Sequence, residues 1–136
     1  MNSVTVKTTQ KAEIVNVTGL VAPLVAHVDA GIAVISVPHT SAALIICEDD
    51  AELREDIIRA AQEVFAPLRP FKHIRNDNPN AEAHLISAFA GTSVTLGVEK
   101  GVLQLGTYQN LLLLELDGPK TRQLQCFTLA GEQTYT

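Results

Sequence analysis

Three polar residues separate two apolar segments of the chain. His39, Thr40 and Ser41 follow the apolar run 31–37 and precede the apolar run 43–47. Polar side chains at the end of a buried strand lie where ligand pockets form. A serine nucleophile activated by histidine is one interpretation, although the chain has no Gly-x-Ser-x-Gly sequence and adjacency in sequence does not give the geometry of a catalytic triad. The alternative is that Thr40 and Ser41 hydrogen-bond to the backbone of a turn.

Two further histidines suggest a metal site. His73 lies within the polar segment 67–83, and His84 directly follows that segment. Together with His39 they supply three imidazoles, and three protein ligands with an open fourth position are typical of catalytic zinc. Cys47 is either a buried, inert thiol or a soft metal ligand. The alternative is that the histidines only hydrogen-bond within the fold.

Acidic residues gather where the second apolar run ends. Asp49 and Asp50 precede a helical pattern, and Asp49 with Glu52 three residues later forms a capping-box pattern. Capping and the helix dipole account for both aspartates. Glu48 has no such role, and we therefore consider it a candidate for acid–base chemistry or metal ligation.

Two segments later in the chain are candidates for anion binding. Thr107 and Gln109 follow Gly106, where backbone N–H groups can face an anion. Lys120 and Arg122 follow a Gly-Pro turn and can neutralise a phosphate. Each segment alone is also typical of a hairpin turn. The chain has neither a Walker loop nor a strand–Gly-x-Gly-x-x-Gly–helix unit, so nucleotide binding has no specific support.

The elements that must position these residues are mainly strands. Alternating or continuous apolar residues predict strands over residues 4–8, 13–18, 31–37, 43–47, 92–98, 108–116 and 121–129. The first two are expected to pair with each other, and the next two to be central strands buried on both faces. Helical spacing predicts helices over residues 20–28, 50–66 and 84–89. The sum is an α+β fold, a mainly antiparallel β-sandwich with one long and one or two short helices.

Length and composition narrow the class of protein. With 136 residues, the chain is expected to form a single domain, residues 1–136. A net charge of −5 argues against a nucleic-acid partner. The longest apolar runs fall far short of the ~20 residues that span a membrane. The first residues lack the pattern of a signal peptide, so we expect a cytoplasmic protein whose two cysteines are free thiols.

A set of short motifs together resembles one family. In chain order the motifs are His39-Thr40-Ser41-Ala42, Glu48-Asp49, Asn80-Ala81-Glu82-Ala83-His84-Leu85, Gly91-Thr92-Ser93, Gly101, Leu105-Gly106-Thr107-Tyr108-Gln109 and Asp117-Gly118-Pro119-Lys120-Thr121-Arg122. Their order, and their spread over about residues 5–130, are similar to the YjbQ family. Members of that family are often labelled secondary thiamine-phosphate synthase.

The resemblance implies a β-sandwich with helices, assembled as a homotrimer, and a polar pocket near subunit contacts lined by His39, His73 and His84. It implies that anions or metals occupy this pocket. It also implies a reaction that joins a pyrimidine methyl diphosphate to a thiazole phosphate and releases diphosphate. Such a reaction needs a divalent cation, here zinc or magnesium, and basic side chains to neutralise the leaving group. The available basic side chains are Lys120, Arg122 and Arg75.

The chain departs from the family pattern in four places. Cys47 replaces the usual Asn, and Asn78-Pro79 replace two acids that could hold magnesium. Tyr108 replaces Trp, and Lys120 replaces Arg. A cysteine near histidines favours zinc over magnesium.

Two hypotheses follow for the function. The first is an enzyme that accepts a small phosphorylated substrate, with His39, Glu48 and His84 as catalytic groups. The residues expected to contact the substrate are Thr40, Ser41, Arg75, Thr107, Gln109, Lys120 and Arg122. The second is a non-catalytic trimeric module that binds a metal, through His39, His73, His84 and Cys47, or binds a small anion.

Overall fold

The structure is a computed structural model that describes residues 2–73 and 80–131. Its strands are β1 (Asn2–Lys7), β2 (Glu13–Asn16), β3 (Ala30–Ser36), β4 (Ala42–Cys47), β5 (Ser93–Glu99), β6 (Val102–Leu103), β7 (Asn110–Glu115) and β8 (Thr121–Ala130). Its helices are α1 (Thr18–Val21), α2 (Ala51–Phe65) and α3 (Ala81–Ala90), with two short 3-10 helices, η1 (Ala22–Val25) and η2 (Ala66–Leu68). In this described part of the chain, no helix has the length and apolar character needed to cross a membrane.

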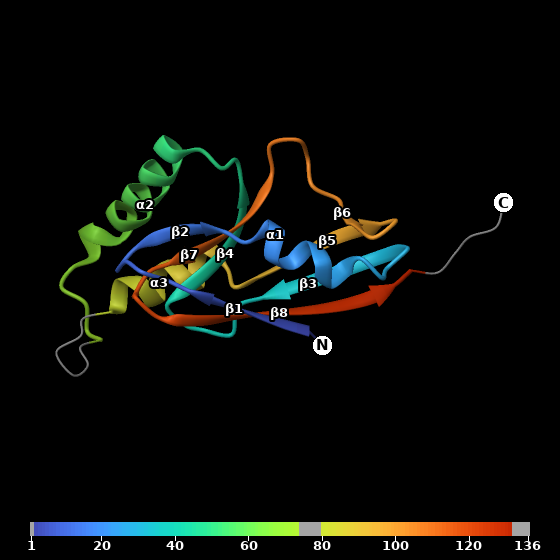
Figure 1. Cartoon of the computed structure of the whole chain (residues 1–136). Coiled ribbons are helices and arrows are strands. Elements are labelled where there is room, and N and C mark those ends of the chain that lie inside the picture. Colours follow the sequence, from blue (N-terminus) through green and yellow to red (C-terminus); the bar gives the residue numbers. More distant parts are fainter. Residues whose placement is uncertain (1, 74–79, 132–136) are drawn as a thin grey trace.

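The strands form two antiparallel sheets that pack together (Figure 1). The larger sheet has the strand order β1-β8-β3-β5-β6, and the smaller sheet has the order β2-β7-β4. α2 and α3 cover the outer face of the smaller sheet, where apolar residues of both helices and of its three strands share one cluster. The predicted α+β class and the mainly antiparallel sandwich are confirmed.

β7 explains the unbroken run of leucines in the sequence. Leu111 and Leu113 contribute to the core between the sheets, whereas Leu112 and Leu114 pack in the cluster under the helices. All four side chains are at most 3% exposed. Side chains alternate between the two faces of a strand, so only a strand covered on both faces is apolar at every position. Glu115, fully buried at the end of β7, therefore needs a partner for its charge.

Three predictions about the elements are wrong. β1 and β2 do not pair with each other: β1 pairs with β8, and β2 pairs with β7 in the other sheet. The chain crosses between the sheets at Thr8, whose N–H donates to Lys120 O at 2.8 Å. β4, predicted to be central, is an edge strand of the smaller sheet. α1 and η1 replace the continuous helix predicted over 20–28, because Pro23 lacks the N–H that an α-helix requires at that point.

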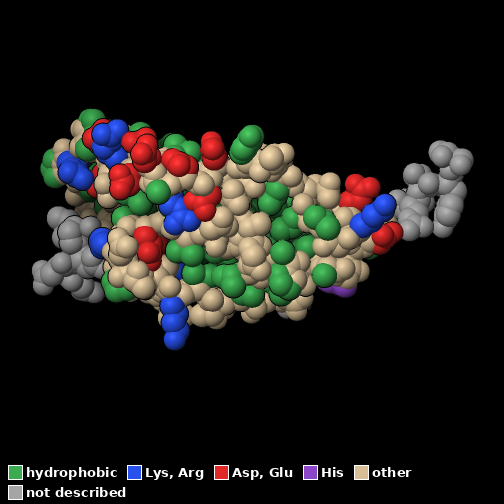
Figure 2. Space-filling model, turned by 45° about the horizontal axis from the view of Figure 1, so that its top comes forward, with side chains coloured by type: hydrophobic (Ala, Val, Ile, Leu, Met, Phe, Trp, Pro, Cys, Tyr) green, Lys and Arg blue, Asp and Glu red, His purple; other side chains and the backbone are tan. Residues whose placement is uncertain are grey.

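α2 has the predicted amphipathic character, but its cap is one residue later than expected. Asp50, not Asp49, is the N-cap, and its carboxylate accepts a hydrogen bond from Leu53 N–H at 3.0 Å. Asp49 instead accepts hydrogen bonds from Arg54 and Asn16, which ties β2 to the start of the helix. Figure 2 shows charged side chains gathered over α2, so this helix presents its polar side to solvent.

α3 begins at Ala81, three residues before the predicted start at His84. His84 and Ser87 are three residues apart, so they lie on one face of the helix. That face packs on β4, where Ser87 Oγ donates to Ala42 O at 2.6 Å. α3 therefore brings His84 to the start of β4, next to the polar segment that contains His39.

Candidate functional site

A cavity of about 500 Å³ lies where the segment between β3 and β4 meets α3. Its lining residues are His39, Thr40, His84, Ser87, Ala88 and Thr92. Three predicted site residues, His39, Thr40 and His84, thus come together from distant parts of the sequence. The lining includes no carboxylate, so an anion that enters this cavity meets no like charge there.

The fold determines which ring nitrogen of His84 is available. Its Nδ1 lies 2.7 Å from Thr40 O. A carbonyl oxygen only accepts, so Nδ1 must carry a proton and donate it. Within residues 2–73 and 80–131, no side chain or backbone group forms a hydrogen bond with Nε2. This nitrogen therefore accepts a hydrogen bond or a proton when the ring is neutral, and donates when the ring is protonated.

His39 has the opposite arrangement. Its Nε2 accepts a hydrogen bond from Gln123 N–H at 3.0 Å, so Nε2 carries no proton and Nδ1–H is the donor. Burial, and next the positive charge of Arg122, lower the pKa of His39 below its ordinary value. Of the two histidines that line the cavity, His39 is therefore a neutral Nδ1–H donor, and His84 has an Nε2 without a hydrogen-bond partner among the described residues.

Arg122 and Glu115 form a buried ion pair under the segment that carries His39, with side chains 3% and 0% exposed. Arg122 Nε donates to Glu115 Oε1 at 2.9 Å, and Arg122 Nη2 donates to Ser41 O at 3.0 Å and to Ser41 Oγ at 2.9 Å. Burial alone would raise the pKa of Glu115, but hydrogen bonds from Arg122, from Thr8 and from the Asp117 backbone hold it below its ordinary value.

This burial is incompatible with the predicted substrate contacts of Ser41 and Arg122. Both residues are at most 4% exposed. The donors of Arg122 are used by Glu115 and Ser41, and Ser41 Oγ serves as an acceptor for Arg122 rather than as a partner of a histidine base. Both residues therefore hold the polar segment in place, and the serine-hydrolase interpretation has no support in this geometry.

Lys120 is also engaged within the protein. Its Nζ donates to Asp117 Oδ2 at 3.0 Å, and Lys11 forms a second ion pair with Asp117. Burial raises the pKa of Asp117, but hydrogen bonds from Lys11, Lys120 and Asn80 outweigh it and bring the pKa to about 2. The Lys120 side chain is 43% exposed, so its stem reaches solvent while its charge is directed at a buried carboxylate.

Four predicted site residues lie at the other end of the smaller sheet, namely Cys47, Glu48, Thr107 and Gln109. β4 runs from Ala42 to Cys47, and at about 3.3 Å per residue its two ends are roughly 17 Å apart. β7 is antiparallel to β4, so the turn before β7 lies at the Cys47 end. In that turn Gln109 Oε1 accepts from Gly106 N–H at 2.8 Å. Within one chain these residues do not share a site with His39 and His84.

The proposed metal ligands are not assembled. His73 packs edge to face on His84, with ring centroids 5.2 Å apart, but Cys47 lies at the far end of β4 and His39 Nε2 is used by the backbone. In the described ranges, no three His, Cys, Asp or Glu side chains are grouped to hold a metal ion. The four predicted metal ligands therefore do not form one metal site among the described residues of a single chain. Cys47 and Cys126 are free thiols, as predicted, and Arg75 lies outside the described residues.

Sequence reasoning missed Glu115 and Ser87. The sequence could have indicated the role of Glu115, because a single charged residue inside the apolar run 111–116 has to be buried and therefore needs a partner of opposite charge. For Ser87, the sequence offers only its spacing of three residues from His84. The role of Gln123 was also missed, since it uses its backbone N–H, which every residue except proline has.

The fold and this geometry define a class of small α+β sandwich proteins with a histidine-lined cavity between a strand and a helix. The chain belongs to the UPF0047 family: the family model described as UPF0047 protein YjbQ-like matches residues 2–131. It is 41% identical to a UPF0047 protein of Archaeoglobus fulgidus over 88% of this chain and 94% of that relative. It is 34% identical to UPF0047 protein YugU of Bacillus subtilis over 90% of this chain and 93% of that relative.

Solved structures share the fold. A hypothetical protein from Aeropyrum pernix K1 has a TM-score of 0.88 and 36% identity, covering 96% of this chain and 98% of that one. A YbjQ-like protein of unknown function from Sulfolobus solfataricus P2 has a TM-score of 0.88 and 35% identity, covering 96% of both chains. The resemblance to the YjbQ family is confirmed.

The expectation of thiamine-phosphate synthase activity is wrong as an assignment. The relatives carry the family designation UPF0047, and one solved structure is described as a protein of unknown function. None of these descriptions supports the joining of a pyrimidine diphosphate to a thiazole phosphate, so the transferase assignment is dropped with it. The function has to be argued from the cavity itself.

Proposed function

We propose that the cavity between α3 and the segment joining β3 to β4 binds the anionic group of a small phosphorylated molecule. The observation that carries the proposal is the complementary hydrogen bonding of the two histidines. His39 is held as a neutral Nδ1–H donor, and His84 is held by Nδ1 so that Nε2 is available. Thr40 and Thr92 line the same cavity, and a threonine hydroxyl is a hydrogen-bond donor as well as an acceptor.

His84 can interact with a bound molecule in two ways, depending on whether its imidazole is protonated. When the imidazole is protonated, Nε2–H makes a charge-assisted hydrogen bond to a phosphate oxygen. When the imidazole is neutral, the same nitrogen accepts a proton from a bound hydroxyl group or water. The site thus supports binding and, for a ligand with a transferable proton, acid–base chemistry through His84. His39 remains a donor throughout, because its other nitrogen is used by the backbone.

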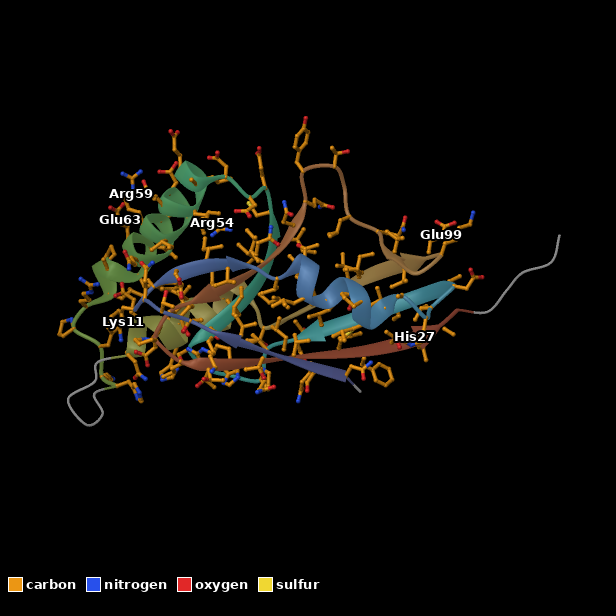
Figure 3. The ribbon with its side chains drawn as sticks, in the orientation of Figure 1. Lys11, His27, Arg54, Arg59, Glu63 and Glu99 are labelled. Carbon is orange, nitrogen blue, oxygen red and sulfur yellow. The ribbon has the colours of Figure 1, made fainter. Side chains whose placement is uncertain are left out.

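Replacing His84 tests the proposal. In calorimetric titrations with inorganic phosphate and methyl phosphate, we expect His84→Ala to weaken binding about tenfold or more, because a hydrogen bond to a charged group contributes roughly 1.5–3 kcal/mol. His27→Ala is the matched control. His27 hydrogen-bonds with Thr128 and lies at one end of the molecule, whereas Lys11 and α3 lie at the other end (Figures 1 and 3). Equal phosphate affinity in wild type and His84→Ala would contradict the proposal.

The second candidate for binding at His84 is a divalent metal ion, with His84 as one of its ligands. The observation in its favour is the Nδ1–H···O=C hydrogen bond, which is also how metal-bound histidines are held. Elemental analysis of dialysed wild type and His84→Ala decides between the candidates. About one zinc or magnesium per chain, lost in the variant, would replace the phosphate proposal.

We infer that copies of this chain associate as the homotrimer that the family resemblance implies, through the outer face of the larger sheet. The helices pack on the smaller sheet and beside β6, away from this face. Phe127 and Leu129 of β8 are 49% and 56% exposed there, opposite Val34 and Ile32 of β3. A contiguous apolar patch of this kind is typical of a protein–protein interface.

A further inference from the structure

A separate cavity, of about 110 Å³, lies where the start of α3 meets α2 and the turn between β1 and β2. The polar residues that line it are Lys11, Gln62, Asn80 and Glu82. It shares no lining residue with the cavity that contains His39 and His84. The proposed function therefore makes no use of it.

Two hydrogen-bond acceptors at this cavity lack a donor. Asn80 Oδ1 and Glu82 Oε1 are buried, and no donor within residues 2–73 and 80–131 pairs with either atom. The other terminal atom of each group is engaged. Asn80 Nδ2 donates to Asp117 Oδ2 at 3.4 Å, and Glu82 Oε2 accepts from Arg69 Nη2 at 2.6 Å. Because a buried acceptor without a donor is costly, these two oxygens favour a ligand that brings N–H or O–H groups.

The charges around the cavity favour an uncharged ligand. Glu82 pairs with Arg69. The neighbouring Asp117 pairs with both Lys11 and Lys120. Two carboxylates thus lie among three basic groups, so a cationic ligand would add to an excess of positive charge.

The rest of the cavity wall is apolar. Ala83, Ile86 and Leu116 line it, and each is at most 8% exposed. A buried water needs two to four polar partners, and these side chains offer none. A molecule with an apolar part beside its donor group matches both sides of the cavity. The volume is below the about 150 Å³ of a cavity that holds benzene, so the molecule has only a few non-hydrogen atoms.

We propose that this cavity binds the primary amide group of a small uncharged molecule. One NH₂ group carries two N–H donors, which match the oxygens of Asn80 and Glu82. The last side-chain torsions of Asn and Glu have broad energy wells, so a small rotation turns both oxygens toward a donor in the cavity. The amide carbonyl accepts from Lys11 or from the Gln62 side chain, which line the same cavity.

The test compares acetamide with acetate in NMR titrations of the wild-type full chain. The two molecules have the same number of non-hydrogen atoms, but acetate has no N–H group. Molecules this small bind weakly, and NMR detects weak binding residue by residue. We expect acetamide to shift the backbone N–H signals of Glu82, Ala83 and Ile86 until they saturate, and acetate to leave them unchanged.

Replacing Glu82 locates the binding. Glu82→Ala should weaken acetamide binding about tenfold, because a hydrogen bond to a charged acceptor is lost. Glu99→Ala is the matched control and should bind acetamide as wild type does. Glu99 is exposed and lies at the opposite end of the molecule from Lys11 (Figure 3).

The comparison of probes on wild type does not depend on how well a variant folds. Equal shifts with acetamide and acetate, or no shifts with either, would overturn the inference. Tighter binding of methylammonium than of acetamide would overturn it in favour of a cation site. Acetamide binding of equal strength in Glu82→Ala and Glu99→Ala would place the amide elsewhere and would also overturn it. None of these outcomes affects the phosphate proposal, which rests on His39 and His84.

Discussion

At the residue scale, the two histidines of the cavity differ because the backbone engages a different nitrogen in each. Gln123 N–H is a donor and leaves His39 Nε2 unprotonated, whereas Thr40 O is an acceptor and requires a proton on His84 Nδ1. The lowered pKa of His39, caused first by burial and next by Arg122, agrees with its neutral state. Two residues of the same type thus differ in which ring nitrogen carries the proton and which one the backbone engages.

Asp117 provides a pH test at the same scale. Its pKa is lowered from 3.8 to about 2 in the folded protein. A carboxylate whose pKa is lower in the folded than in the unfolded protein stabilises the fold at pH values above the unfolded pKa. This contribution is lost as the pH falls from about 4 through about 2. We expect Asp117→Asn to lower the free energy of unfolding at pH 7 by about 2 kcal/mol, and to have little effect near pH 2. Urea denaturation of both proteins at several pH values measures this difference, and a penalty of equal size at pH 2 and pH 7 would contradict it.

At the element scale, the site depends on an ion pair and hydrogen bonds that connect elements of different layers. Glu115 ends β7 in the smaller sheet, and Arg122 lies in β8 of the larger sheet, so their ion pair connects the two sheets. Arg122 also binds Ser41, directly before β4. Together with the hydrogen bonds of His39 to β8 and of Thr40 and Ala42 to α3, this holds every residue from 39 to 42.

The buried pair carries the prediction at this scale. We expect Arg122→Met to lower the free energy of unfolding by about 3–5 kcal/mol, because it leaves the Glu115 charge buried without its partner. The double variant Arg122→Met with Glu115→Leu should recover most of that loss, since no unpaired charge remains. Denaturant unfolding of the single and double variants provides the measurement. A double variant as unstable as the single one would show that the cost comes from lost packing.

At the scale of the whole molecule, the layers are unequally covered. The smaller sheet lies between the larger sheet and α2 with α3, which is why β7 is apolar at every position from Leu111 to Leu114. The larger sheet contributes only its inner face to the core, and its outer face carries exposed Ile32, Phe127 and Leu129. Burial of that outer face between copies would remove this apolar surface from water.

The assembly prediction belongs to this scale. If the outer face of the larger sheet joins the copies, the wild-type mass in solution should be three times 14.6 kDa. Phe127→Glu should shift the protein to the monomer mass, because it places a charge in an apolar interface. Phe89→Glu, on α3, is the control and should leave the mass unchanged. Light scattering after size exclusion gives these masses, and an intact trimer of Phe127→Glu would assign the interface to another face.

The local elements and the two central histidines, His39 and His84, were predicted from the sequence. Strands and α2 follow from periodic apolar patterns, which depend only on neighbouring residues. The order of the motifs, among them those that contain His39 and His84, identified the family that the comparisons confirm. The cap of α2 shows the limit of this reasoning. Asp49 and Asp50 are equivalent as local patterns, and they are distinguished by the hydrogen bonds that Arg54 and Asn16 of β2 donate to Asp49.

Which of the candidate residues share a site follows from tertiary packing and not from the sequence pattern. Antiparallel pairing separates Cys47 and Glu48 from His39 by the length of β4, although all lie within ten positions of the chain. Burial turned Arg122 from a predicted anion contact into the partner of Glu115. The protonated nitrogen of each histidine is likewise set by backbone groups distant in sequence. The physical reason is common to all three: burial and hydrogen-bond partners come from long-range packing, which no local pattern encodes.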